Sequence, residues 1–191
     1  MKKIFTLLSV ALISTAAMAQ STWKVDKAHS RLQFTITHLA VSDVDGSFKD
    51  FDVTITSAKP DFSDAKVSLA AQTASVNTEN DRRDSHLKSA DFFDSAKNPT
   101  MTFYSTGITP NGAGKYKLTG NLTLNGVTKP VTMDLWHRGT VTNAQSKKEN
   151  AGFKVTGTIK RSDFNFGKGF GNSTLSDEVE ITANGEFGKA S

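Results

Sequence analysis

The chain has 191 residues, with 23 Lys and Arg against 19 Asp and Glu, and it contains no cysteine. It is therefore long enough for one domain with its own core, and disulfides are excluded as a source of its stability. A charge so near balance, with both signs mixed along the chain, argues against nucleic acid as a partner.

The first 19 residues are typical of an export signal. Two lysines precede an apolar run over residues 4–16, and Ala17-Met18-Ala19 supplies the small side chains that signal peptidase requires. That run is shorter than a bilayer-spanning helix needs, and no cysteine follows it to carry a lipid. We therefore expect residues 1–19 to be a signal peptide cleaved near Ala19. The mature domain, residues 20–191, should have no stable membrane anchor and should be periplasmic or secreted.

Beyond residue 22, apolar and polar residues alternate with a period of two, as in half-buried strands of an antiparallel sheet. Asn125-Gly126, a strong hairpin signal, separates two of these runs. The pattern predicts an all-β fold with eight strands, at about residues 30–39, 46–56, 65–75, 100–108, 114–124, 128–141, 151–161 and 177–187. Eight strands suit a closed antiparallel barrel that holds one small ligand, although a two-sheet sandwich can have the same number.

Two segments break this alternation. Residues 77–94 are dense in charge and end in Phe92 and Phe93. We interpret them as a helix of one to three turns across one mouth of the barrel, capped by Asn77 or Thr78, with both rings pointing inward. Residues 162–176 are rich in Gly and Phe, which favours a flexible loop at the rim.

Phenylalanine dominates the aromatic residues, with 13 Phe against two Trp and two Tyr. Because Phe has no polar group, a space lined by Phe favours an apolar guest that needs no hydrogen bonds. The same rings could fill a core that has no cavity, and the sequence leaves these two possibilities open.

The histidines are the natural candidates for chemistry. Their spacing, without cysteine, does not supply three or four metal ligands, so we expect no metal site. Asp84, His86 and His38 could act as an acid–base group, which gives an alternative function: a hydrolase or isomerase acting on an apolar substrate. The Gly-x-Ser-x-Gly motif is absent, however, and Arg83 favours an ion-paired network in which it bridges a carboxylate. We therefore expect no catalytic residue and no enzyme activity.

A series of motifs follows in a fixed order along the chain. They are His29-Ser30-x-x-x-Phe34-x-Ile36-x-His38-Leu39, Gly46-x-Phe48-x-x-Phe51, Asn77-x-x-x-x-Arg82-Arg83-Asp84-x-His86-Leu87-Lys88, Asp91-Phe92-Phe93-Asp94, Pro99-x-Met101-x-Phe103, Tyr116-x-Leu118-x-Gly120-x-Leu122-Thr123-Leu124-x-Gly126-Val127-Thr128 and Arg161-x-Asp163-Phe164. In this combination the chain resembles the YceI family of secreted lipocalin-like proteins, and the resemblance covers essentially the whole mature sequence.

The resemblance implies an extended eight-stranded barrel with a helix near one end, which carries a long isoprenoid, a quinone-type chain or another amphiphile such as a fatty amide. It also implies a periplasmic, stress-associated protein with no general enzymatic activity and no cofactor other than a bound lipid. We expect a long-chain apolar small molecule as the partner, for transport, storage or sequestration, in a protein that could be a homodimer.

Strand parity assigns the residues that should line the ligand pocket. They are Phe34, Ile36, Phe92, Phe93, Phe103, Leu118, Leu122, Met133, Phe153 and Phe164, with His38, Arg83 and His86 as polar contacts at the mouth.

Overall fold

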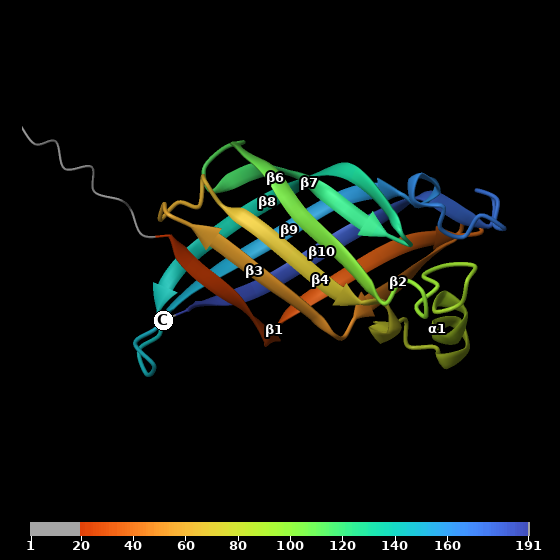
Figure 1. Cartoon of the computed structure of the whole chain (residues 1–191), viewed down its shortest axis with the longest axis horizontal. Coiled ribbons are helices and arrows are strands. Elements are labelled where there is room, and N and C mark those ends of the chain that lie inside the picture. The colour runs from red at the N-terminus through yellow and green to blue at the C-terminus, as the bar shows by residue number, and fades with distance from the viewer. Residues whose placement is uncertain (1–19, 191) are drawn as a thin grey trace, which may run out of the picture.

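The structure, a computed structural model, describes residues 20–190, so the predicted signal peptide lies outside the described residues. Within them the chain forms ten strands, one α-helix and two 3-10 helices (Figure 1). The strands are β1 (Ser21–His38), β2 (Ser42–Phe48), β3 (Phe51–Ser57), β4 (Lys66–Gln72), β5 (Val76–Asn77), β6 (Thr100–Pro110), β7 (Lys115–Leu124), β8 (Val127–Thr142), β9 (Glu149–Lys160) and β10 (Leu175–Lys189). The helices are η1 (Thr73–Ser75), α1 (Asp81–Leu87) and η2 (Arg161–Phe164).

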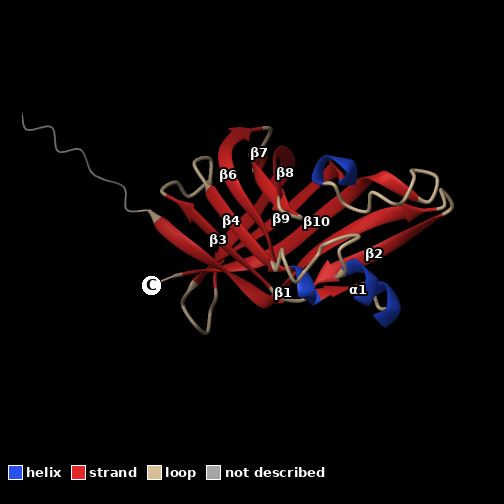
Figure 2. Cartoon of the chain, turned by 45° about the vertical axis from the view of Figure 1, so that its right-hand side comes forward, coloured by secondary structure: helices blue, strands red, loops and turns tan. Residues whose placement is uncertain are grey.

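The strands form one antiparallel sheet that closes on itself. β10, β9, β8, β7, β6, β4, β3 and β1 are hydrogen-bonded in this order, and β10 also pairs with β1. This closure excludes a two-sheet sandwich and confirms the predicted eight-stranded antiparallel barrel. The strands run obliquely around an elongated barrel, and α1 lies at the end opposite the C-terminus (Figures 1 and 2).

Two of the predicted strand boundaries are wrong. Residues 46–56, predicted as one strand, belong to β2 and β3, which are separated by a bend at Lys49-Asp50. Because both pair with β1, one after the other, they take a single place in the ring, and the count of eight holds. β1 begins at Ser21 rather than at residue 30, because an irregularity between Asp26 and Arg31 breaks the alternation that would have revealed its first half.

The hydrogen-bond ladder of β1 is interrupted in its middle. Residues 25–31 pair with neither β2 nor β3, and only Gly185 of β10 stands opposite residues 27–30. A Cβ at position 185 would lie 2.9 Å from Ser30 Oγ, so glycine leaves room for this buried hydroxyl. The hydroxyl accepts a hydrogen bond from the Glu186 N–H (3.2 Å). The barrel wall is therefore bent here, rather than continuous.

Two hairpin turns have positive φ angles at consecutive residues but use different side chains. Asn125 and Gly126, between β7 and β8, have φ of 50° and 73°. Leu39 and Ala40, between β1 and β2, have φ of 53° and 56°. Asn and Gly are favoured in this conformation, which costs most other residues ~1–2 kcal/mol each. The β1–β2 turn therefore carries strain that the β7–β8 turn largely avoids.

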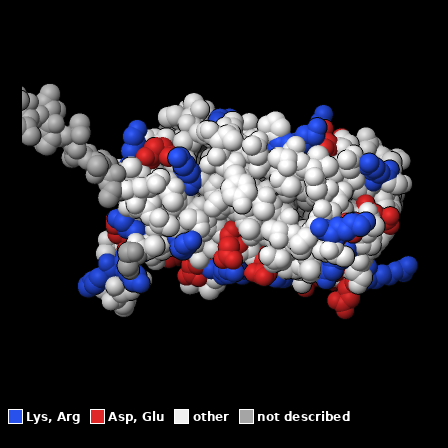
Figure 3. Space-filling model, in the orientation of Figure 1, with Lys and Arg blue, Asp and Glu red and all other residues white. Residues whose placement is uncertain are grey.

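The outer surface of the barrel is polar but unevenly charged. On the face seen in Figure 1, charged side chains lie at the ends and along one edge, and a broad central area is uncharged (Figure 3). This is the wet face of an antiparallel sheet whose other face lines the interior. None of the helices within residues 20–190 is long and apolar enough to span a bilayer.

Candidate ligand-binding site

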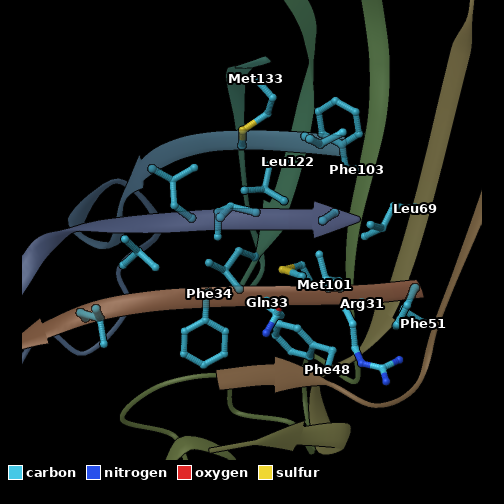
Figure 4. A pocket seen from close by; sticks show the side chains of 18 of the residues that line it. Arg31, Gln33, Phe34, Phe48, Phe51, Leu69, Met101, Phe103, Leu122 and Met133 are labelled. Carbon is cyan, nitrogen blue, oxygen red and sulfur yellow. The ribbon is translucent and has the colours of Figure 1, made fainter. Parts of the chain in front are cut away.

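An internal cavity of about 380 Å³ lies within the barrel. Its wall consists mainly of apolar side chains from the inner faces of the strands. Figure 4 shows Met133, Leu122 and Phe103 on one side of this space, with Phe34 and Phe48 on the other. Small-molecule sites typically enclose ~300–1,000 Å³ and are mostly apolar. Of the two possibilities that the sequence left open, the structure therefore has the cavity rather than a full core.

Glycines keep large side chains flat against the cavity wall. A Cβ at Gly46 would lie 2.2 Å from Cζ of Phe34, its partner across the β1–β2 ladder. A Cβ at Gly157 would lie 2.1 Å from the sulfur of Met133. Real Cβ atoms do not approach so closely, so alanine at either position would displace the large side chain. The glycines thus help to keep the lumen open.

Twelve of the thirteen positions that sequence analysis assigned to the ligand line this cavity. They are Phe34, Ile36, His38, Arg83, His86, Phe92, Phe93, Phe103, Leu118, Leu122, Met133 and Phe153. Phe164, from the segment predicted as a rim loop, is the exception, and it lies in η2. Its side chain is 1% exposed and packs in the core.

A cluster of aromatic rings closes one end of the barrel. Phe62, from the loop between β3 and β4, is 1% exposed. Its ring centroid lies 5.2 Å from that of Trp23, 4.9 Å from Phe153 and 4.6 Å from His137. Burial lowers the pKa of His137, in spite of a hydrogen bond at Gly139 that acts in the opposite direction. The His137 ring is therefore favoured in its neutral form, as one more ring of this cluster.

The other end is covered by α1, the segment after it, and the loop between η2 and β10 (residues 165–174, here the rim loop). Phe92 and Phe93 are each 5% exposed and line the cavity. Phe92 stacks on Phe170 of the rim loop with centroids 5.2 Å apart, and Phe93 meets Phe166 edge-on at 4.6 Å. Ring contacts thus join the two segments into a cover over the lumen.

Thr78 is the centre of the polar network that holds α1. Asn80 caps the helix by accepting a hydrogen bond from the Arg83 N–H (2.9 Å), so the predicted caps, Asn77 and Thr78, are wrong. Asp84 accepts from the Thr78 N–H (2.8 Å) and hydroxyl (2.6 Å). Arg83 donates to the Thr78 hydroxyl and carbonyl, each at 2.7 Å. The prediction that Arg83 bridges a carboxylate directly is also wrong. Arg83 and Asp84 are consecutive in α1, so their side chains point ~100° apart, and Thr78 contacts both of them.

The structure does not bring Asp84 and His86 together as an acid–base pair. The Asp84 carboxylate is engaged by Thr78, whereas His86 Nε2 lies 3.1 Å from Oδ2 of Asp91. The His86 ring also packs edge-on against Phe92 at 5.0 Å. His38 lines the cavity from the end of β1. No group of three or more His, Asp or Glu side chains in the described part of the chain is placed to hold a metal ion.

Arg161 organises the rim loop, whereas sequence analysis named it only within a family motif and assigned it no role in the site. Its side chain lines the cavity and the residue is 4% exposed. It donates hydrogen bonds to five carbonyl groups: Phe166 (3.2 Å), Gly167 (2.9 Å), Phe170 (2.7 Å), Leu175 (3.1 Å) and Ser176 (3.0 Å). A buried cation requires such compensation. The loop predicted as flexible is thus wrapped around one guanidinium group.

Polar residues also line the cavity beside the interrupted part of β1. They are Ser30, Arg31, Gln33 and Asn184. Figure 4 shows the Arg31 guanidinium directed away from the apolar space, and its Nη1 donates to the Ser30 carbonyl (2.8 Å). Lys27 crosses the interruption to Asp50 (3.3 Å) and Asp52 (3.2 Å). Sequence analysis did not assign Arg31 and Gln33 to the site, because parity places positions 31 and 33 on the outer face.

A closed eight-stranded antiparallel barrel with an apolar cavity is the architecture of lipocalin-like binding proteins. The model of the YceI-like domain family matches residues 23–187, and the chain belongs to this family.

Comparison with individual proteins agrees with this assignment. Protein YceI of Salmonella newport (strain SL254) is 40% identical over 183 residues, which cover 95% of this chain and 94% of that protein. The crystal structure of the Campylobacter jejuni YceI protein has a TM-score of 0.75 at 37% identity, covering 81% of this chain and 90% of that one. A polyisoprenoid binding domain from Saccharophagus degradans shares the fold, with a TM-score of 0.67 at 15% identity, covering 91% and 100% of the two chains.

Proposed function

We propose that this chain is an exported protein, periplasmic or secreted, that holds one long apolar molecule inside its barrel. The guest is an isoprenoid, a quinone-type chain or a fatty amphiphile, bound for transport, storage or sequestration. The observation that carries this proposal is the apolar cavity of about 380 Å³, closed by rings at one end and covered by ring contacts at the other. The Saccharophagus degradans domain of the same fold is a polyisoprenoid binding domain, which supports this class of guest.

The energetics of such a site favour the tail of the guest over its head group. Each buried CH2 contributes ~0.8 kcal/mol, so fifteen to twenty carbons give ~12–16 kcal/mol before the costs of ordering and association. A wall of this kind discriminates weakly between tails, because one methylene is worth only ~1–3 kcal/mol of selectivity. Selection of the head group falls to the polar residues at the mouth, for which we propose Arg83, His86 and His38.

Native mass spectrometry of the protein purified from its own host, followed by organic extraction, tests this function directly. We expect a stoichiometric adduct that extracts as a long-chain lipid. An adduct-free mass that does not change when long-chain prenols or quinones are added would contradict the proposal.

A pair of glycine variants tests whether the guest occupies the lumen. Gly46→Ala should push the Phe34 ring out of its place against the wall, because the new Cβ would overlap it. We expect about tenfold weaker uptake of a fluorescent apolar probe, equivalent to ~1.4 kcal/mol. Gly152→Ala is the matched control, because its Cβ would lie at an ordinary 3.6 Å from Arg138 Cβ. Equal affinities in the two variants would place the probe elsewhere.

A further inference from the structure

The turn between β1 and β2 exposes apolar side chains at one end of the barrel. It consists of Leu39, Ala40 and Val41, here called the apolar tip. Leu39 is 53% exposed and Val41 is 82% exposed. Large exposed apolar side chains that project together from a turn are uncommon, because turn residues are usually polar or glycine.

The chain maintains this tip at a conformational cost. At the β7–β8 turn, where φ is also positive at two consecutive residues, it uses Asn125 and Gly126, whereas the tip has Leu39 and Ala40. The tip is thus both strained and exposed to water. Where backbone strain and exposed apolar side chains coincide, the segment has a role other than stabilising the fold.

The tip lies next to the rim of the cavity, although none of its three residues lines the cavity. His38, directly before it, lines the cavity, and the Leu39 N–H donates to the carbonyl of Thr174 (2.9 Å), another lining residue at the end of the rim loop. Tip and rim loop together carry a single charged side chain, Lys168. Figure 1 shows that both lie at the end opposite the C-terminus, the end that carries α1.

We propose that the apolar tip inserts into the surface of a lipid bilayer and sets the covered mouth of the barrel against the membrane. The delivery step that this implies, passage of the guest between lumen and bilayer without exposure to water, rests on the proposed function. The insertion itself rests on the tip alone.

The size and charge of the tip favour a bilayer over a protein partner. A stable protein interface buries ~800 Å² on each side, far more than three residues offer, whereas a few apolar side chains suffice for interfacial insertion into lipid. Asp43 and Asp45 follow the tip on β2, so attraction to anionic head groups does not assist it. We therefore expect binding to phosphatidylcholine vesicles that does not increase when phosphatidylglycerol is added.

Vesicle flotation with a redesigned tip tests the insertion. The variant Leu39→Asn/Ala40→Gly/Val41→Thr removes the apolar groups and introduces the Asn-Gly pair of the β7–β8 turn. It should be at least as stable as the wild type and should bind vesicles about tenfold more weakly, which corresponds to ~1.4 kcal/mol. Val141→Thr is the matched control, since Val141 is 67% exposed near the end of β8. That end of β8 lies beside the C-terminus, away from the end that carries α1 (Figure 1). Wild-type binding by the redesigned variant, or no vesicle binding by the wild type, would overturn the proposal.

Transfer kinetics separate this proposal from the proposed function. For the wild type loaded with a fluorescent apolar probe, the rate of transfer to acceptor vesicles should rise with vesicle concentration. The redesigned tip should reduce that rate without changing the affinity for the probe. If the protein takes up no probe but floats through its tip, the proposed function fails and the insertion stands. If probe uptake is normal but the tip affects neither flotation nor transfer, the insertion fails and the proposed function stands.

Discussion

His137 is the residue whose ionisation is most directly connected to the closed end of the barrel. Its ring lies 5.1 Å from that of Phe153 and 4.6 Å from that of Phe62. Its Nε2 lies 3.1 Å from the Thr140 hydroxyl. Burial lowers its pKa below the ordinary value of 6.5, so protonation in the folded state is opposed by the rings around it.

This shift predicts a loss of stability in mild acid. Below pH ~6.5 the unfolded chain takes up a proton at His137 that the folded chain does not bind, until the lower folded-state pKa is reached. The free energy of unfolding should therefore fall across that window. His137→Phe, which retains a ring, should remove this component. In urea titrations between pH 7.5 and pH 5, the free energy of unfolding should fall more steeply with pH for the wild type than for the variant.

His29 provides a control of opposite sign. The Asp26 carboxylate, which accepts a hydrogen bond from Nδ1 of His29 (2.9 Å), raises the pKa of this exposed histidine. Its stabilising effect is therefore fully present below pH ~6.5 and is lost as the pH rises through the folded-state pKa. The free energy of unfolding of the wild type, relative to that of His29→Gln, should rise as the pH falls.

The His137 prediction would be contradicted if the free energies of unfolding of the wild type and His137→Phe ran parallel against pH. That result would show that His137 has the same pKa in the folded and unfolded states.

At the scale of single residues, the sequence predicted positions on strands better than positions elsewhere. Parity located Phe34 and Met133 on the cavity wall because a strand alternates strictly between its two faces. Phe164 and Arg161 fall in η2, where that rule has no force. Parity places Ser30 on the inner face with Phe34, but it could not reveal the hydrogen bond of the Ser30 hydroxyl, which depends on the local irregularity of β1.

At the scale of elements, the rim loop depends on Arg161 for its shape. Lysine would keep the charge but would lose the planar fork that reaches several carbonyl groups at once. Arg161→Lys should lower the free energy of unfolding by about 2–4 kcal/mol, because buried carbonyl groups lose their donors. Equilibrium unfolding in urea measures this change. Lys160→Met, at the exposed neighbouring position, should stay within ~0.5 kcal/mol of the wild type, and an equal effect of both substitutions would refute the role of Arg161.

The elements that sequence analysis placed well are those with local signals. Alternation and Asn125-Gly126 located β7 and β8 closely, because a hairpin and its strands are encoded by neighbouring residues. The bend at Lys49-Asp50 depends instead on β1, which pairs with β2 and β3 in turn. The start of α1 was misplaced because several residues near Asn80 can cap a helix. Tertiary contacts decided what local preference left open.

At the scale of the whole molecule, closure and cavity are distinct properties. The sequence predicted an eight-stranded barrel, but it could not show whether the interior is filled. That depends on side-chain volumes across the lumen, such as Phe34 lying over Gly46, which pair residues from different strands. The aromatic clusters at the two ends support the barrel while the middle remains open. The fold therefore keeps apolar surface available for a guest, and a guest should stabilise the whole barrel.

That stabilisation should depend on the length of the guest. For a series of straight-chain alcohols, affinity should rise about fourfold with each added methylene, since each contributes ~0.8 kcal/mol when buried. The rise should stop once the tail fills the lumen, because further carbons remain in water. At one fixed concentration of alcohol, thermal stability should follow the same order, because a ligand that binds more tightly is present at a larger multiple of its Kd. A ligand at 100 times its Kd adds ~2.7 kcal/mol to the free energy of unfolding, and its extraction removes this gain. Gly46→Ala should reach the plateau at a shorter tail than Gly152→Ala does. An affinity independent of chain length would mean that the tail lies outside the barrel.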